Sequence, residues 1–240
     1  MRYLDLTLPS PAANLACDQA LLERCDAGTL DGVLRVWEPA RPFVVLGYSR
    51  PMTRDVHVAA CRRARLPILR RYSGGGTVLQ GRGCLNYTLA VSVAHDPRFA
   101  TLRGTNRLVA EAHRLLLERL VQRPVRAEGA TDLAIDGRKV SGNAQRRALR
   151  AVLFHGTFLY AFDLAQVGRF LPIPAAQPAY RRNRPHDAFL MNLPLAAQAL
   201  KDALRRTWQA DGPPPAVPAE RVRELVQTQY ATAEWNEKYP

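Results

Sequence analysis

The feature that most constrains this fold is a predicted tight turn at Asp136-Gly137. The pair is flanked by the apolar run Leu133-Ala134-Ile135 and by Arg138-Lys139-Val140. Asp-Gly between such runs favours a two-residue turn, because Asp and Gly tolerate the backbone conformations that this turn requires. We therefore predict an antiparallel hairpin in which Ile135 pairs with Arg138, Ala134 with Lys139, and Asp132 with Ser141.

This hairpin places candidate reactive groups on one face. In the predicted register Asp132 and Lys139 are diagonal neighbours, roughly 7 to 8 Å apart at the backbone, within reach of long side chains. Ser141 and Gly142 follow directly and add small polar positions. The alternative is a surface hairpin whose exposed Lys-Asp pair stabilises little. We favour a ligand-facing site with Lys139 and Asp132 as its catalytic candidates.

A second motif is a glycine loop beside two arginines. It begins with Arg70-Arg71-Tyr72-Ser73 and continues with Gly74, Gly75, Gly76, Thr77 and Val78. A phosphate-binding P-loop would need Lys and then Ser or Thr after its last glycine, and the dinucleotide fingerprint would need a third glycine where Asn86 stands, so both are excluded. A tight turn between strands is the plain alternative. The paired arginines favour a loop that holds an anionic small molecule.

The remaining pattern predicts a chain of mixed strands and helices. Asn86 lies in a strand whose apolar residues alternate with polar ones, so it projects from the face opposite the apolar row. His155-Gly156 interrupts another apolar strand, which makes His155 either a pocket residue or a hydrogen-bonded core residue. The expected strands are 2–8, 33–37, 43–47, 67–72, 85–93 and 152–160, and the expected helices are 11–28, 55–65, 101–122, 195–209 and 218–229.

Composition limits the classes of protein that fit. The chain has 240 residues, is 47% hydrophobic and carries a net charge of +13, which favours acidic partners or substrates. Its basic residues do not alternate with aromatic residues in a nucleic-acid-binding pattern, so nucleic acid is not the favoured partner. Four cysteines lack metal-ligand spacing and indicate free thiols. Without a signal peptide or a membrane-spanning run, we expect a soluble, cytoplasmic protein. The Arg-rich connector 172–185 suggests a lid or a docking surface.

Taken together, these motifs resemble the lipoate-protein ligase A and octanoyltransferase superfamily. The resemblance rests on Arg70 to Val78 with Leu85-Asn86-Tyr87, on Asp132-Leu133 with Gly137 to Gln145, and on His155-Gly156-Thr157. The terminal stretch 230–236 is similar to that family's end motif. The resemblance implies an α/β (α+β) fold of the biotin/lipoate protein ligase type, with a mixed, largely antiparallel sheet flanked by helices. We expect a catalytic domain over 1–210 and a C-terminal helix and tail, 211–240, packed on it, without a separate accessory domain.

The resemblance also implies roles for residues. Lys139 would contact the lipoyl carboxylate and the α-phosphate of ATP, and Asp132 would hold Mg²⁺ or orient the incoming amine. The predicted substrate-binding residues are Arg70, Arg71, Ser73, Gly74, Gly75, Gly76, Thr77, Val78, Leu79, Asn86, Ser141, Gly142 and His155, of which Val78 and Leu79 would contact the acyl chain.

The implied activity is a lipoate-protein ligase. Lipoate and ATP would give lipoyl-adenylate, and the lysine of a lipoyl carrier domain would then accept the lipoyl group. Adenylation with help from a separate small accessory subunit stays open. So does octanoyl or lipoyl transfer without ATP, although the transferases most similar here use a cysteine upstream of the lysine motif and 123–131 contains none. A non-catalytic carrier-binding or nucleic-acid-binding protein is the competitor from another class.

Overall fold

The computed structural model describes residues 1–239. Within them, a seven-stranded sheet has the order β1-β2-β6-β10-β9-β8-β7 and a small sheet has the order β4-β3-β5. The β1-β2 and β3-β4 pairs are parallel and the other pairs are antiparallel. The strands are β1 Arg2–Asp5, β2 Gly32–Trp37, β3 Phe43–Leu46, β4 Ile68–Arg70, β5 Val78–Gln80, β6 Cys84–Ser92, β7 Arg126–Glu128, β8 Asp132–Ile135, β9 Arg138–Arg147 and β10 Ala151–Leu159.

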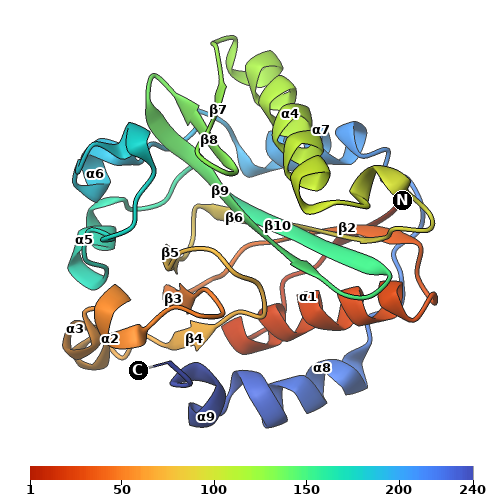
Figure 1. Ribbon diagram of the computed structural model, residues 1–240, viewed down its shortest axis with the longest axis horizontal. Coiled ribbons are helices and arrows are strands. Elements are labelled where there is room, and N and C mark those ends of the chain that lie inside the picture. Colours follow the sequence, from red (N-terminus) through yellow and green to blue (C-terminus); the bar gives the residue numbers. More distant parts are fainter. Residues whose placement is uncertain (240) are drawn as a thin grey trace.

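Helices cover both faces of the large sheet (Figure 1). Helices α1 and α8 lie on one face, and α4 and α7 lie on the other. The α-helices are α1 Pro11–Asp26, α2 Met52–Asp55, α3 Val58–Arg63, α4 Leu102–Val121, α5 Ala165–Phe170, α6 His186–Phe189, α7 Ala197–Thr207, α8 Ala219–Leu225 and α9 Ala233–Asn236, with short 3-10 turns at Pro97–Phe99 and Ala179–Arg181 and a π-helical turn at Val226–Tyr230.

Because helices cover both faces of the large sheet, β6 is more buried than the sequence pattern predicts. All nine of its residues are buried, so the predicted strand with one apolar face is in fact buried on both. Leu89 and Val91 pack in the core under α4 and α7, whereas Ala90 packs in the core under α1. Asn86 and Thr88 are polar and still buried, because the face opposite the apolar row borders a cavity and is not open to solvent.

Local capping signals in the sequence explain where two long helices begin. The Ser10 side chain accepts a hydrogen bond from the Ala13 amide at 3.1 Å, and a proline follows it in the first helical turn. Thr101 caps α4 in the same way through the Gly104 amide. Within α4, His113 is fully buried and its Nε2 accepts a hydrogen bond from Trp208. This histidine therefore packs in the core.

The Asp136-Gly137 turn forms as predicted, with both residues at positive φ. Ala134 pairs with Lys139, and Ile135 pairs with Arg138. The predicted pairing of Asp132 with Ser141 is wrong, because a bulge between Leu133 and Ala134 shifts the register and pairs Leu133 with Ser141. An extra residue on one strand of the hairpin is sufficient to move the partner by one position.

The small sheet and its helices form a third packed cluster beside the large sheet. The predicted helix 55–65 is confirmed only over α3, because the backbone is extended at Val56, and a separate short helix, α2, ends at Asp55. Asp55 consequently ends α2, and its carboxylate turns toward neighbouring polar groups. The C-terminal tail, after α9, lies close to this sheet (Figure 1).

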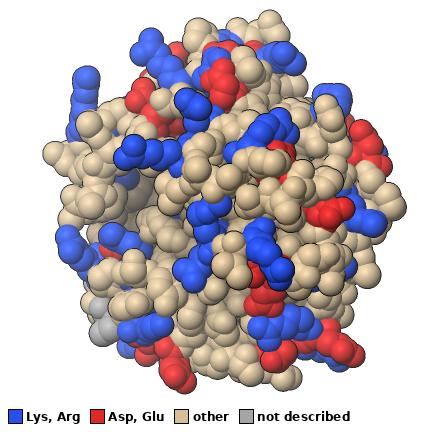
Figure 2. Space-filling view, turned by 45° about the vertical axis from the view of Figure 1, so that its right-hand side comes forward, with Lys and Arg blue, Asp and Glu red and all other residues tan. Residues whose placement is uncertain are grey.

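The charge of the surface is mixed. On the face shown in Figure 2, basic side chains are scattered among acidic ones and do not gather in one patch. None of the helices in residues 1–239 is long and apolar enough to cross a membrane.

Candidate active site

A cavity of about 480 Å³ lies between the small sheet and the centre of the large sheet. Its walls come from β3 and β5, from β6, β9 and β10, and from the segment 171–190. The cavity brings together most of the predicted site. It is lined by Arg71, Gly75, Gly76, Thr77, Val78, Leu79, Asn86, Asp132, Lys139, Ser141, Gly142 and His155, but not by Arg70, Ser73 or Gly74.

Lys139 and Asp132 meet on the side of the cavity that the β8-β9 hairpin forms, which we call the hairpin wall. The Lys139 Nζ lies 2.7 Å from Asp132 Oδ1, and the Tyr180 hydroxyl donates a hydrogen bond to Asp132 Oδ2 at 2.8 Å. Burial, followed by the nearby Asp132 charge, raises the pKa of Tyr180, so Tyr180 keeps its proton and remains a donor. Gly142 lets the lysine lie close to β9, since a Cβ there would come within 2.8 Å of Nζ.

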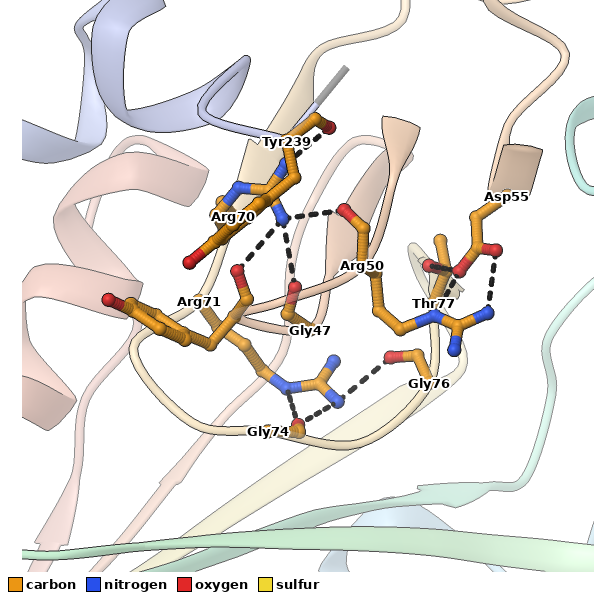
Figure 3. A network of polar contacts seen from close by, with 10 residues as sticks. Gly47, Arg50, Asp55, Arg70, Arg71, Gly74, Gly76, Thr77 and Tyr239 are labelled. Atoms are coloured by element: carbon orange, nitrogen blue, oxygen red, sulfur yellow. Dashed lines mark hydrogen bonds and ion pairs between the residues drawn. The ribbon is translucent and has the colours of Figure 1, made fainter. Parts of the chain in front are cut away.

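Arg71 organises the glycine loop and also faces the cavity (Figure 3). Its Nη2 donates to the Gly74 and Gly76 carbonyls at 2.6 and 2.9 Å, and its Nε donates to the Ser73 hydroxyl. Burial lowers the pKa of Arg71 to about 10, so the guanidinium stays positive at neutral pH. The fixed charge suits an anionic ligand.

The prediction that Arg70 contacts substrate is not supported by its position. The side chain is fully buried and turned away from the cavity, because successive residues leaving a strand point to opposite sides. Its guanidinium donates to six backbone carbonyls, which belong to Gly47, Tyr48, Arg50, Trp235, Asn236 and Tyr239. Figure 3 shows the contacts with Gly47, Arg50 and Tyr239. Arg70 therefore joins the C-terminal tail to the turn before α2.

Ser73 and Gly74 contribute indirectly. The Ser73 Oγ accepts from Arg71 Nε at 3.1 Å and lies 2.5 Å from His155 Nε2. Burial, with a smaller effect of the Arg71 charge, lowers the pKa of His155 to about 3. The imidazole is thus neutral at neutral pH, and its Nε2 shares a hydrogen bond with the Ser73 hydroxyl. Arg71, Ser73 and His155 form one hydrogen-bonded chain from the loop to β10.

Polar groups on β5, β6 and β10 line the inner part of the cavity. Gln80 Nε2 donates to Thr157 Oγ1 at 2.7 Å, and Thr157 Oγ1 donates to Asn86 Oδ1 at 2.6 Å. Within residues 1–239, Asn86 Nδ2, Gln80 Oε1 and Ser141 Oγ are buried without hydrogen-bond partners. They leave one donor, one acceptor and one hydroxyl available at the cavity wall.

The side of the cavity that the glycine loop forms is called the loop wall. Sequence reasoning missed a cluster of polar residues there. Asp55 accepts from Arg50 through both carboxylate oxygens, at 2.5 and 2.7 Å, and from the Thr77 hydroxyl at 2.7 Å. These hydrogen bonds outweigh the cost of burying the carboxylate and lower the pKa of Asp55. All three residues line the cavity. Thr77 belongs to the predicted site, but no local motif indicated Arg50 or Asp55, because these two meet only when the turn into α2 folds back on the loop.

A second group missed from sequence lies on the segment 171–190. Arg181, His186 and Phe189 line the cavity opposite the glycine loop. The arginine-rich composition of 172–185 indicated a lid or a docking surface but did not show that Arg181 points inward. Its neighbour Arg182 is exposed.

The described residues do not form a metal site by themselves. They contain no group of three or more His, Cys, Asp or Glu side chains placed to hold an ion. Both carboxylate oxygens of Asp132 already accept from Lys139 and Tyr180. The role that the resemblance implies for Asp132, holding Mg²⁺ or orienting the incoming amine, stays a prediction.

The four cysteines lie outside the lining of the cavity. Cys17, Cys25, Cys61 and Cys84 are all buried, and none lines the cavity among residues 1–239. Burial raises the pKa of Cys84 to about 12, which keeps its thiol protonated. Among the described residues, the cavity wall carries the cationic side chains of Arg50, Arg71, Lys139 and Arg181 and the acidic side chains of Asp18, Asp55 and Asp132.

Comparison with known proteins now decides the family. Residues 10–209 match the family described as the lipoyl protein ligase A/B catalytic domain. This chain belongs to that family. It is 27% identical to the octanoyltransferase LipM of Lysinibacillus sphaericus, with 95% of both chains covered. It is 31% identical to a protein of Aeropyrum pernix named after lipoate-protein ligase A, over 70% of this chain and 61% of that protein.

Solved structures confirm the predicted biotin/lipoate ligase-like fold. A bipartite lipoate protein ligase of Thermoplasma acidophilum superposes with a TM-score of 0.81 at 22% identity, covering 100% of this chain and 96% of that chain. A lipoate-protein ligase A bound with ATP superposes with a TM-score of 0.83 at 21% identity, covering 100% and 99%. The protein is an enzyme of the lipoate ligase and transferase family.

Proposed function

We propose that this protein is a lipoate-protein ligase that activates its acid with ATP. The observation that carries the proposal is that Lys139 lines the cavity whereas no cysteine among residues 1–239 does. Acyl transfer through a thioester needs a thiolate at the acyl carbon. Adenylation needs no protein nucleophile, only cations that stabilise a crowded, negative transition state.

In the first step, a carboxylate oxygen of lipoate attacks the α-phosphorus of ATP. A new P–O bond forms, the bond to the β-phosphate oxygen breaks, and pyrophosphate leaves. Lys139 offsets the repulsion between the two anions, and Arg71 supplies a second fixed charge. The amides of Gly75 to Thr77 hold the phosphate, and Val78 and Leu79 contact the acyl chain. Asn86, Ser141, Gly142 and His155 complete the substrate wall.

In the second step, the lysine amine of a carrier domain attacks the activated carbonyl carbon. An amide bond forms, AMP leaves, and the amine proton passes to solvent. The Thermoplasma acidophilum ligase is described with its E2 lipoyl domain, which supports a lipoyl domain as the acceptor here. Its bipartite organisation also supports a test with and without a separate accessory subunit.

The proposal is tested with Lys139→Ala. We expect formation of lipoyl-adenylate to fall by a factor of about 10² to 10³, as when a transition-state charge partner is lost. Pyrophosphate release and the mass of an apo lipoyl domain are the readouts. Lys201→Ala is the control, because Lys201 pairs with Asp5 outside the cavity. If wild-type protein gives no mass increase that depends on ATP and lipoate, the ligase proposal is wrong.

The second candidate is octanoyl transfer from acyl carrier protein without ATP. It is favoured by the LipM relatives, which match along almost their whole length. The same assay with octanoyl carrier protein and no ATP separates the two activities. Transfer that survives in Lys139→Ala and is lost in Cys84→Ser would support this candidate.

A further inference from the structure

Two of the cations that line the cavity lack a carboxylate partner. Among the described residues, the Lys and Arg side chains on the cavity wall are Arg50, Arg71, Lys139 and Arg181. Arg50 pairs with Asp55, and Lys139 pairs with Asp132. Arg71 and Arg181 form no ion pair within residues 1–239. Arg71 is held by its own loop, so Arg181 is the charge for which no role has been given.

Arg181 is fixed by neutral groups. Its Nε donates to the Arg184 carbonyl at 3.1 Å, and its guanidinium lies 4.6 Å from the centre of the Phe189 ring. Its Nη2 lies 3.3 Å from His186 Nδ1, while His186 Nε2 lies 3.1 Å from the Pro172 carbonyl. The carbonyl can only accept, so Nε2 carries the hydrogen and Nδ1 accepts from Arg181. The imidazole is therefore neutral and leaves the guanidinium charge unbalanced.

Such a charge is costly to bury. Arg181 is 5% exposed, and desolvation lowers its pKa, yet an arginine stays charged in a protein. Arg70 is also buried without a carboxylate, but six carbonyl oxygens surround it. Arg181 has one carbonyl, and its Nη1 has no hydrogen-bond partner in the described chain. A buried cation that faces a cavity and keeps a free donor has the features of an anion-binding group.

The segment that carries Arg181 is attached to the Lys139 hairpin. Tyr180, the preceding residue, donates to Asp132, the partner of Lys139. Arg184 Nη2 donates to the Gly137 carbonyl at 2.7 Å, and the Met191 amide donates to the Lys139 carbonyl at 2.9 Å. Arg181 and Lys139 thus belong to one hydrogen-bonded wall.

We propose that Arg181 binds an oxyanion of the substrates, held together with Lys139. The group is either a phosphate of the nucleotide or the carboxylate of the acid, since both offer paired oxygens to a guanidinium. This deepens the proposed function and rests on it. The loop wall and the hairpin wall would then contribute one carboxylate-free arginine each, Arg71 and Arg181, to opposite sides of the bound anion.

The test measures binding by calorimetry of three probes separately: inorganic pyrophosphate, a non-hydrolysable ATP analogue, and lipoate. Arg181→Gln should weaken at least one of them tenfold or more. Loss with pyrophosphate and the ATP analogue assigns the phosphate, and loss with lipoate alone assigns the carboxylate. Arg182→Gln, which removes an exposed charge from the same segment, should bind all three like wild type.

A second variant guards against a folding defect. Arg181→Lys keeps the charge but loses the planar donor geometry, so we expect an affinity between those of wild type and Arg181→Gln. Equal affinity of wild type and Arg181→Gln for every probe would overturn this inference and leave the ligase proposal standing. If folded wild type binds neither the ATP analogue nor lipoate, the ligase proposal itself fails.

Discussion

The two walls of the cavity use arginine and lysine in different ways. On the glycine-loop wall, Arg70 and Arg71 bond mainly to backbone carbonyls and so fix the shape of the chain. On the hairpin wall, Lys139 bonds to a carboxylate and Arg181 to neutral groups, and both face the cavity. Arg70 supports only the backbone of its wall, Arg71 supports the backbone and also faces the cavity, and the cations of the hairpin wall face the cavity without supporting the glycine loop. Membership of one sequence motif therefore does not tell which of two arginines, such as Arg70 and Arg71, faces the cavity.

The largest effect should come from the neighbouring pair Arg70 and Arg71. Arg70→Met removes six hydrogen bonds to backbone carbonyls, although the Gly47 and Tyr239 carbonyls keep a backbone amide as a donor. We expect the free energy of unfolding to fall by about 3 to 5 kcal/mol. Arg71→Met removes fewer hydrogen bonds, so its unfolding free energy should fall by about 1 to 2 kcal/mol. Urea denaturation of both variants measures the difference. A larger loss in Arg71→Met would reverse the roles assigned to the two residues.

The rate of adenylate formation should also distinguish Arg70 from Arg71. Arg71→Met should lose adenylate formation beyond what its stability loss explains, because the glycine loop loses its internal support and the cavity loses a charge. Arg70→Met should regain activity at low temperature, where enough of the chain is folded. The rate of pyrophosphate release per folded molecule is the quantity to compare.

Local signals predicted much of the fold and of the hairpin wall. The Asp136-Gly137 turn acts over a few residues, so sequence alone indicated it. The bulge beside Ala134 has no comparable signature, and the predicted register failed there. The burial of Asn86 depends on the small sheet that closes the cavity over its face of β6, which alternation along one strand does not reveal.

Long-range contacts explain the other errors at the site. Arg70 bonds to a tail more than 160 residues away, and no period or spacing connects the two segments. Arg181 and Arg182 are indistinguishable in sequence, and only the fold buries the first and exposes the second. Charge next to glycine indicated a loop that does line the cavity, but it could not separate a charge that supports only backbone from a charge that faces the cavity.

The next effect is the pH dependence of the free energy of unfolding. It comes from His155, which is hydrogen-bonded through Ser73 to Arg71. The folded-state pKa of His155, about 3, lies below the ordinary value of 6.5. The unfolded chain then binds a proton that the folded chain does not, so stability is lost as pH falls below about 6.5. Between pH 7 and pH 5 the free energy of unfolding should fall by about 1 to 2 kcal/mol from this group.

Replacing the titrating group isolates that contribution. His155→Gln keeps a polar side chain beside Ser73 but cannot be protonated, so its unfolding free energy should change less between pH 7 and pH 5 than that of wild type. Chemical denaturation at both pH values measures the difference. Identical pH dependence in the two proteins would mean that the imidazole is not held neutral by the loop wall.

The smallest expected effect comes from adding one methyl group, by a Gly→Ala substitution, to each wall in turn. A Cβ at Gly142 would lie 2.8 Å from Lys139 Cε and Nζ, whereas a Cβ at Gly74 would meet nothing within 4 Å. Gly142→Ala should therefore displace the flexible end of Lys139, lowering adenylate formation about tenfold, or about 1.4 kcal/mol, with little change in stability. Gly74→Ala should leave both quantities unchanged. If the two variants have equal activity, the position of Lys139 does not depend on the space that Gly142 leaves.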